Sequence, residues 1–282
     1  MNNLKYNITD KVPFPNILIY GLQQMLAVFV ATVLIANICG TPVDACLIGA
    51  CIGTLIYQLI TKFRSPMFIS SCGATVSAVL GALAIGDNGQ NYLAVVIGGI
   101  IILLVYAAFA LFIKFRGIEA VSKILPPIII GPITMVIGLN LAKFIPTYTL
   151  VNGEHNNIGI LVAIVTMFIV AISSHFLKGF WKTIPFLIGL VGGYVLSIIL
   201  TATDCAPLID FSIFKDMRLF RVPDFSFLHW SNNNLQWSDI GTIALLFVPV
   251  SICAICEHWA DHCTLSNIIG TDLTKNPGLS RT

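Results

Sequence analysis

Charged side chains are scarce in this chain of 282 residues, since Asp, Glu, Lys and Arg together make up 10% of it. A soluble domain carries roughly 25% charged residues, so this chain has too few charges to cover a surface that faces water. Apolar residues instead make up 57%, and the mean hydropathy is +0.91. The composition therefore excludes an ordinary soluble protein and indicates one that lies in a lipid bilayer.

Signatures of several other functions are also absent. The sequence has no tract of Lys and Arg, which argues against nucleic acid as a partner. It has no Gly-x-Ser-x-Gly motif, no P-loop and no Gly-x-Gly-x-x-Gly after a strand, so nothing indicates an enzyme or a bound cofactor.

The eight cysteines lie mostly in apolar stretches, where free cysteine behaves as a small hydrophobe, and we expect no disulfide framework. The polar N-terminus has no small-residue cleavage site, so we expect no signal peptide.

Long apolar runs, broken by polar or Gly/Pro clusters, divide the chain into eight segments that can cross a membrane. Each is close to the length of about 20 mostly apolar residues that a span needs. We expect helices, because lipid offers no hydrogen-bond partner for backbone N–H and C=O groups and a helix pairs them internally. The segments are 16–38, 43–61, 66–86, 92–114, 122–143, 158–177, 183–203 and 239–263. The sequence therefore predicts an all-α, multi-pass integral membrane protein.

The positions of the 15 Lys and Arg residues predict a cytoplasmic N-terminus, because cytoplasmic loops carry an excess of basic residues. In this orientation four basic residues lie outside: Lys143, Lys215, Arg218 and Arg221. The other eleven lie on the cytoplasmic side: Lys5, Lys11, Lys62, Arg64, Lys114, Arg116, Lys123, Lys178, Lys182, Lys275 and Arg281.

The third segment departs from the pattern of a simple helix. Ser70, Ser71, Gly73 and Ser77 crowd into its first half, and small residues with Gly weaken a helix. Non-helical backbone at membrane depth is tolerated only against protein or a water-filled cavity. One interpretation is a discontinuous segment that lines a substrate site. The other is a close helix–helix contact through small residues, and the sequence alone favours neither.

Two carboxyl groups in the last segment are the main candidates for a functional site. Glu257 and Asp261 are four residues apart, so on a helix they share one face. Charge at membrane depth costs at least about 2.5 kcal/mol, while burial and a like-charged neighbour favour the protonated form of a carboxyl group. Such a pair can bind and release a proton. The alternative is a span that ends near Glu257, with Asp261 among the headgroups. His258 points away from Glu257 and is better suited to packing or hydrogen bonding than to ligand binding.

The same stretch gathers side chains of the kinds that bind metals. They are Cys253, Cys256, Glu257, His258, Asp261, His262 and Cys263. Metal ligands on a single helix must share a face. Cys253, Glu257 and Asp261 share one face and the two histidines share another, so we expect no metal.

Four stretches together resemble the nucleobase–ascorbate transporter family, and within it the bacterial uracil permeases. They are GLQQMLAVFVATVLIAN in the first span, SSCGAT in the third, PPIIIGPITMVIGLNLAK in the fifth, and EHWADHCTLSNIIGTDLTKNPGLSRT at the end. The resemblance runs along nearly the whole chain in a consistent order, and the last stretch is the most specific.

The resemblance implies a fold of fourteen spans in two inverted seven-span repeats, with a discontinuous third span that contains a short extended stretch. It places spans 1–4 in a core domain at 1–121, spans 5–7 in a gate domain at 122–203, an external loop at 204–238, and span 8 with a cytoplasmic tail at 239–282. It further implies a protein of the cytoplasmic membrane, which is the bacterial inner membrane. A second copy of the chain is a candidate partner.

The resemblance also implies a site and a function. Glu257 matches the glutamate that hydrogen-bonds the nucleobase, and Asp261, with Glu257 and His258, matches the region tied to proton coupling. Cys72 and Gly73 fall beside the base, and Ala31 matches a backbone contact in the first span. The implied function is uptake of a nucleobase driven by the proton gradient, without a cofactor, and uracil is the favoured substrate.

Some departures keep alternatives open. Gln23-Gln24 replaces the Gln-His of the family, and Cys72 replaces a Phe of the uracil permeases. Asp261 is more typical of purine carriers, so a xanthine or urate symporter is one alternative. An anion carrier of the sulfate-permease type is another, and it predicts a basic group at the site. A membrane enzyme with a metal at the Cys/His/Asp cluster is a third. The spans after the eighth would lie beyond Thr282, so we expect that this chain does not transport unaided.

Overall fold

The structure is a computed structural model that describes residues 6, 10–85, 91–124, 127–148, 150–151, 154–203, 205–212, 222–225, 228 and 235–282. Regular structure in these residues is almost entirely helical. The exception is a pair of two-residue antiparallel strands, β1 (Leu150–Val151) and β2 (Glu154–His155). The expected all-α architecture is confirmed.

Six helices of the described residues are long and apolar enough to cross a membrane, and they coincide with six of the expected segments. They are α1 (Phe14–Cys39), α2 (Val43–Ile60), α4 (Tyr92–Arg116), α8 (Asn157–Phe176), α9 (Pro185–Ala202) and α10 (Trp237–Ile269). The other two expected segments hold shorter apolar helices. These are η1 (Gly73–Thr75) continued by α3 (Val76–Leu83), and α6 (Pro127–Ala142). The short helices α5 (Ile118–Ile124), α7 (Ile145–Tyr148), η2 (Gly179–Thr183) and η5 (Thr274–Gly278) connect or follow them.

The chain divides into two compact units. The first contains Met1–Lys11, Ile35–Asn140 and Asp224–Thr282, and the second contains Val12–Leu34 and Leu141–Pro223. The boundaries of the core and gate domains implied by the resemblance stay a prediction.

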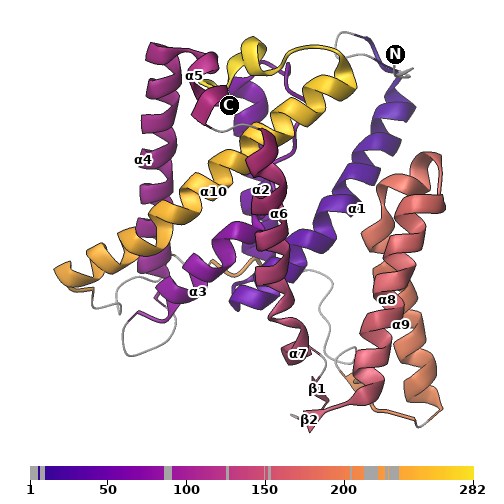
Figure 1. Cartoon of the computed structure of the whole chain (residues 1–282). Helices are drawn as coiled ribbons and strands as arrows, with labels where there is room; N and C mark the ends of the chain where they lie inside the picture. The colour runs from indigo at the N-terminus through magenta and orange to yellow at the C-terminus, as the bar shows by residue number, and fades with distance from the viewer. Residues whose placement is uncertain are drawn as a thin grey trace. The chain divides into compact units, whose positions relative to one another are not determined.

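The first unit is built around α10, which packs against η1, α3 and α4 and crosses α4 in Figure 1. Its core consists of small residues facing large ones: Ala78, Ala82, Ala94, Ile243 and Phe247 are all buried. Small residues allow helix backbones to approach closely in a membrane, and this close approach holds α3 against the first third of α10, around Ile243 and Phe247.

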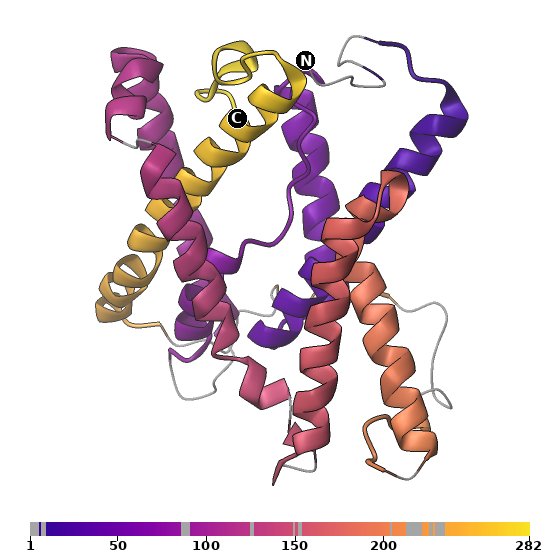
Figure 2. The ribbon, with the colours of Figure 1, turned by 45° about the vertical axis from the view of Figure 1, so that its right-hand side comes forward.

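The third predicted span is discontinuous, as the first of the two interpretations expects, while its role in lining a substrate site stays a prediction. After α2 ends at Ile60, residues 64–72 contain no helix, and Cys72 has an extended backbone with φ −96° and ψ 128°. Figure 2 shows this stretch as a ribbon without helical turns that leads down to η1. Helix begins again only at Gly73. We call residues 64–72 the extended segment.

In the second unit, α8 and α9 lie side by side, as both ribbon views show. Glycines of α9 make this contact possible. A Cβ atom at Gly193 would lie 2.5 Å from the Thr166 hydroxyl oxygen, and one at Gly189 would overlap Val170.

Candidate functional site

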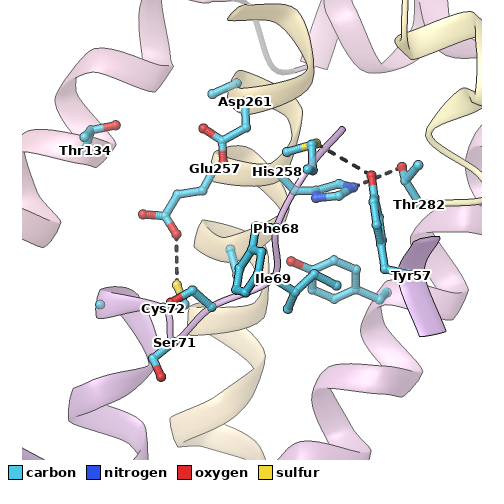
Figure 3. A pocket seen from close by; sticks show the side chains of 16 residues that line it. Tyr57, Phe68, Ile69, Ser71, Cys72, Thr134, Glu257, His258, Asp261 and Thr282 are labelled. Carbon is cyan, nitrogen blue, oxygen red and sulfur yellow. Dashed lines mark hydrogen bonds between the residues drawn. The ribbon is translucent and has the colours of Figure 1, made fainter. Parts of the chain in front are cut away.

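A cavity of about 540 Å³ lies within the first unit, between α10, the extended segment, α2, α4 and α6. Figure 3 shows side chains from these elements converging on it. The lining residues are Tyr57, Met67, Phe68, Ile69, Ser70, Ser71, Cys72, Gly73, Tyr106, Thr134, Ala254, Glu257, His258, Ala260, Asp261 and Thr282. Residues far apart in the sequence thus meet in one space large enough for a small heterocycle.

The centre of the cavity is a contact between α10 and the extended segment. The Cys72 thiol donates a hydrogen bond to Glu257 Oε2 across 2.9 Å, and Figure 3 shows the two side chains pointing at each other. Both are partly buried. The thiol can reach the carboxylate because Cys72 is the last extended residue before η1, and η1 packs against α10. The site therefore presents a carboxylate acceptor beside non-helical backbone.

Asp261 lines the same cavity one helical turn beyond Glu257. The helix does not stop between the two carboxyl groups, because α10 continues to Ile269 and ends at Gly270, whose φ of +74° is left-handed. The shared face expected for Glu257 and Asp261 is therefore present, with both side chains at one cavity.

His258 takes a packing and hydrogen-bonding position at the edge of the cavity. Its Nε2 lies 3.0 Å from the Thr282 hydroxyl oxygen, and its ring meets Tyr106 edge to face with centroids 6.4 Å apart. Gly73, another expected site residue, also lines the cavity and starts η1. Ala31 belongs to the part of α1 in the second unit, whereas every residue lining the cavity belongs to the first.

His262 is a site-adjacent residue that the sequence analysis named only among the possible metal ligands. It is fully buried, its Nδ1 lies 2.9 Å from the His258 carbonyl oxygen, and its Nε2 lies 3.4 Å from the Tyr57 hydroxyl. Since a carbonyl only accepts, Nδ1 carries a hydrogen and donates it, and Nε2 shares a hydrogen bond with the Tyr57 hydroxyl. Tyr57 also lies 2.8 Å from the Ser65 hydroxyl, so this network ties α10, α2 and the extended segment together.

The side chains of α2 that face the extended segment were also missed. Thr54, Tyr57 and Gln58 contact it through hydrogen bonds. Their spacing of three and four residues puts them on one face of a mostly apolar helix. That polar face is the signal in the sequence that could have revealed them.

Within the described residues, no three His, Cys, Asp or Glu side chains gather in a way that could hold a metal ion. The described residues that line the cavity include no Lys or Arg. The basic group that an anion carrier of the sulfate-permease type would place at the site is therefore not among them.

Comparison with known proteins identifies the family. The family described as the permease family matches residues 15–282, which is nearly the whole chain. This chain belongs to that permease family. It is therefore a multi-pass protein of the plasma membrane, related to transporters and not to enzymes.

Curated relatives support the same assignment. The chain is 31% identical over 285 residues to the uracil permease of Bacillus caldolyticus, covering 100% of this chain and 62% of the relative. It is 34% identical over 270 residues to the uracil permease of Bacillus subtilis (strain 168), covering 93% and 59%. It is 29% identical over 286 residues to the uracil permease of Escherichia coli (strain K12), covering 100% and 62%.

The chain thus spans about three fifths of the length of these curated permeases. The resemblance to the nucleobase transporters that the sequence suggested is confirmed at the level of the family.

Proposed function

We propose that this chain serves in the proton-coupled uptake of a nucleobase, with uracil as the favoured substrate. The observation that carries the proposal is the Glu257 carboxylate, which faces a cavity and is hydrogen-bonded there by the Cys72 thiol. A carboxylate only accepts hydrogen bonds, and the edge of a pyrimidine base offers ring N–H donors. The names of the curated relatives support uracil as this base.

The chemistry of the remaining lining suits a flat, polar heterocycle. Phe68 and Tyr106 supply aromatic surface, while Ser70 and Ser71 supply hydroxyl groups beside extended backbone. Binding sites for small molecules combine mostly apolar walls with a few placed polar groups that set orientation. A base whose N–H meets Glu257 at Oε2 would displace the Cys72 thiol from that oxygen.

Proton coupling is assigned to the two carboxyl groups of α10. Glu257 and Asp261 line one cavity and lie one turn apart, and two negative charges there are costly at membrane depth. One proton bound by the pair relieves that cost, and its release on the cytoplasmic side would couple the proton gradient to uptake. A second copy of the chain remains a proposed partner.

The test is uptake of radiolabelled uracil by cells that lack their own uracil permease and express the gene at its native length. Glu257→Gln should lower uptake about 10- to 100-fold, the equivalent of one hydrogen bond to a charged group. Glu119→Gln is the matched control, because Glu119 is exposed on α5 and does not line the cavity. Equal uptake by both variants would remove the assigned role of Glu257.

Two further arms define substrate and coupling. Excess unlabelled uracil should suppress the uptake of radiolabelled uracil, and excess xanthine should not. Stronger suppression by xanthine than by uracil would favour a purine symporter. A protonophore should abolish uptake if the proton gradient drives it.

A further inference from the structure

The backbone of the extended segment needs hydrogen-bond partners from the helices around it. Residues 64–72 form no helix, yet the segment lies between the apolar helices α2 and α10 and carries Cys72 to Glu257. Backbone N–H and C=O groups at membrane depth need partners inside the protein. The position of Cys72 therefore depends on whatever holds the backbone of residues 64–72.

Gln58 of α2 provides much of that support. Its Nε2 donates to the carbonyl oxygen of Met67 across 2.8 Å and to that of Ser65 across 3.1 Å. Both hydrogens of one side-chain amide are thus used on carbonyls two residues apart. A hydrogen-bonded pair of this kind fixes both the position and the direction of the chain.

Thr54, one turn before Gln58, holds the next part of the segment. Its hydroxyl oxygen accepts from the Ile69 backbone N–H across 3.1 Å, and the hydroxyl lies 2.7 Å from the carbonyl oxygen of Ala50 in its own helix. The Thr54 hydroxyl oxygen also lies 3.1 Å from the carbonyl oxygen of Ile69. Thr54 therefore links the backbone of α2 to the backbone of the segment.

These contacts have a regular geometry. In an extended chain, the backbone groups of every second residue point to the same side, because the period is two. Ser65, Met67 and Ile69 are such alternate residues, and it is their backbone groups that meet α2. Thr54 and Gln58 are four apart, so they lie on one face of α2. The polar face of α2 that carries Thr54 and Gln58 therefore lies opposite the edge of the segment that presents the backbone groups of Ser65, Met67 and Ile69.

We propose that Gln58 and Thr54 are positioning residues of the substrate site: from α2 they hold the extended segment in register, which sets the place of Cys72 and Gly73 opposite Glu257. The proposal rests on the function proposed above for that site. Neither residue lines the cavity, so both act through the segment and not by touching the substrate.

The experiment compares isosteric variants with and without the hydrogen-bonding group. Gln58→Met keeps the length of the side chain and removes the donor, while Leu59→Met changes an exposed side chain of the same helix as the control. Thr54→Val keeps the shape and removes the hydroxyl, while Thr54→Ser restores it. Gln58→Met and Thr54→Val should raise KM for uracil about tenfold, since small misplacements of a site reduce binding and turnover by such factors. Leu59→Met and Thr54→Ser should resemble the parent.

A second measurement does not depend on the substrate. In a background where Cys72 is the only cysteine, the rate of its alkylation by N-ethylmaleimide reports how the segment is held against Glu257. Gln58→Met and Thr54→Val should each change that rate about threefold or more, as the loss of one hydrogen bond predicts, and Thr54→Ser should restore it. A parent that takes up no uracil would refute the proposed function, while the alkylation comparison would still decide the positioning role.

Unchanged alkylation in both Gln58→Met and Thr54→Val would overturn the proposal. If Gln58→Met fails to insert into the membrane, the Thr54→Val and Thr54→Ser pair decides by itself, because Thr54→Val keeps the side-chain volume and loses only the hydroxyl, whereas Thr54→Ser keeps the hydroxyl.

Discussion

Glu257 and Cys72 are separated by 185 residues in the sequence and by 2.9 Å in the structure. Neither residue is unusual for its own neighbourhood, since a glutamate in a span has several explanations and a cysteine in an apolar run is common. Their contact is what makes the pair a candidate site. The thiol bonds to Oε2, so it competes with a substrate N–H that approaches this oxygen of the carboxylate.

This contact leads to a prediction for Cys72. Cys72→Ser places a stronger donor near Glu257, and a hydrogen bond to a charged group contributes about 1.5–3 kcal/mol. The serine should compete better with the base and raise KM for uracil, whereas Cys72→Ala removes the competitor and should lower KM. Uptake kinetics of both variants beside the parent measure the order. The reverse order, with Cys72→Ala weakest, would show that the thiol assists binding.

At the scale of elements, α10 organises the first unit by its close packing on α4. The tightest point is Gly98 of α4, where a Cβ atom would overlap the ring of Phe247. The next residue, Gly99, has nothing within 4 Å of the same hypothetical atom. Two adjacent glycines of one helix therefore have opposite environments.

That difference gives a matched pair of variants. Gly98→Ala and Gly99→Ala gain the same helix propensity, so the contrast between them isolates the contact with Phe247. Gly98→Ala should lose about 1–3 kcal/mol of stability through overpacking, while Gly99→Ala should be neutral or slightly stabilising. Thermal unfolding in detergent measures both. Equal midpoints would mean that α4 and α10 are not packed as closely as the structure places them.

At the scale of the whole molecule, the distribution of basic residues predicts how the chain is oriented in the membrane. Lys62 and Arg64 follow α2 and are expected in the cytoplasm, whereas Lys143 follows α6 and is expected outside. Membrane orientation follows such differences because basic residues are retained on the cytoplasmic side.

A pair of single-cysteine variants tests this orientation. In a background without the native cysteines, Lys143→Cys should react with a membrane-impermeant thiol reagent in intact cells. Lys62→Cys should react only after the cells are permeabilised. Labelling of Lys62→Cys in intact cells would contradict a cytoplasmic N-terminus.

Sequence alone determined the membrane class, the approximate spans and the candidate face of Glu257 and Asp261, because hydropathy and helical spacing are local properties that lipid enforces. It indicated that the third span is unusual but left two interpretations, since small residues suit both a break and a close contact. Tertiary structure decided between them, because Thr54, Tyr57 and Gln58 supply the partners that let residues 64–72 stay extended. It also decided which thiol meets Glu257 and how His262 is buried, because such pairings depend on how distant helices pack and not on the order of residues within any one of them.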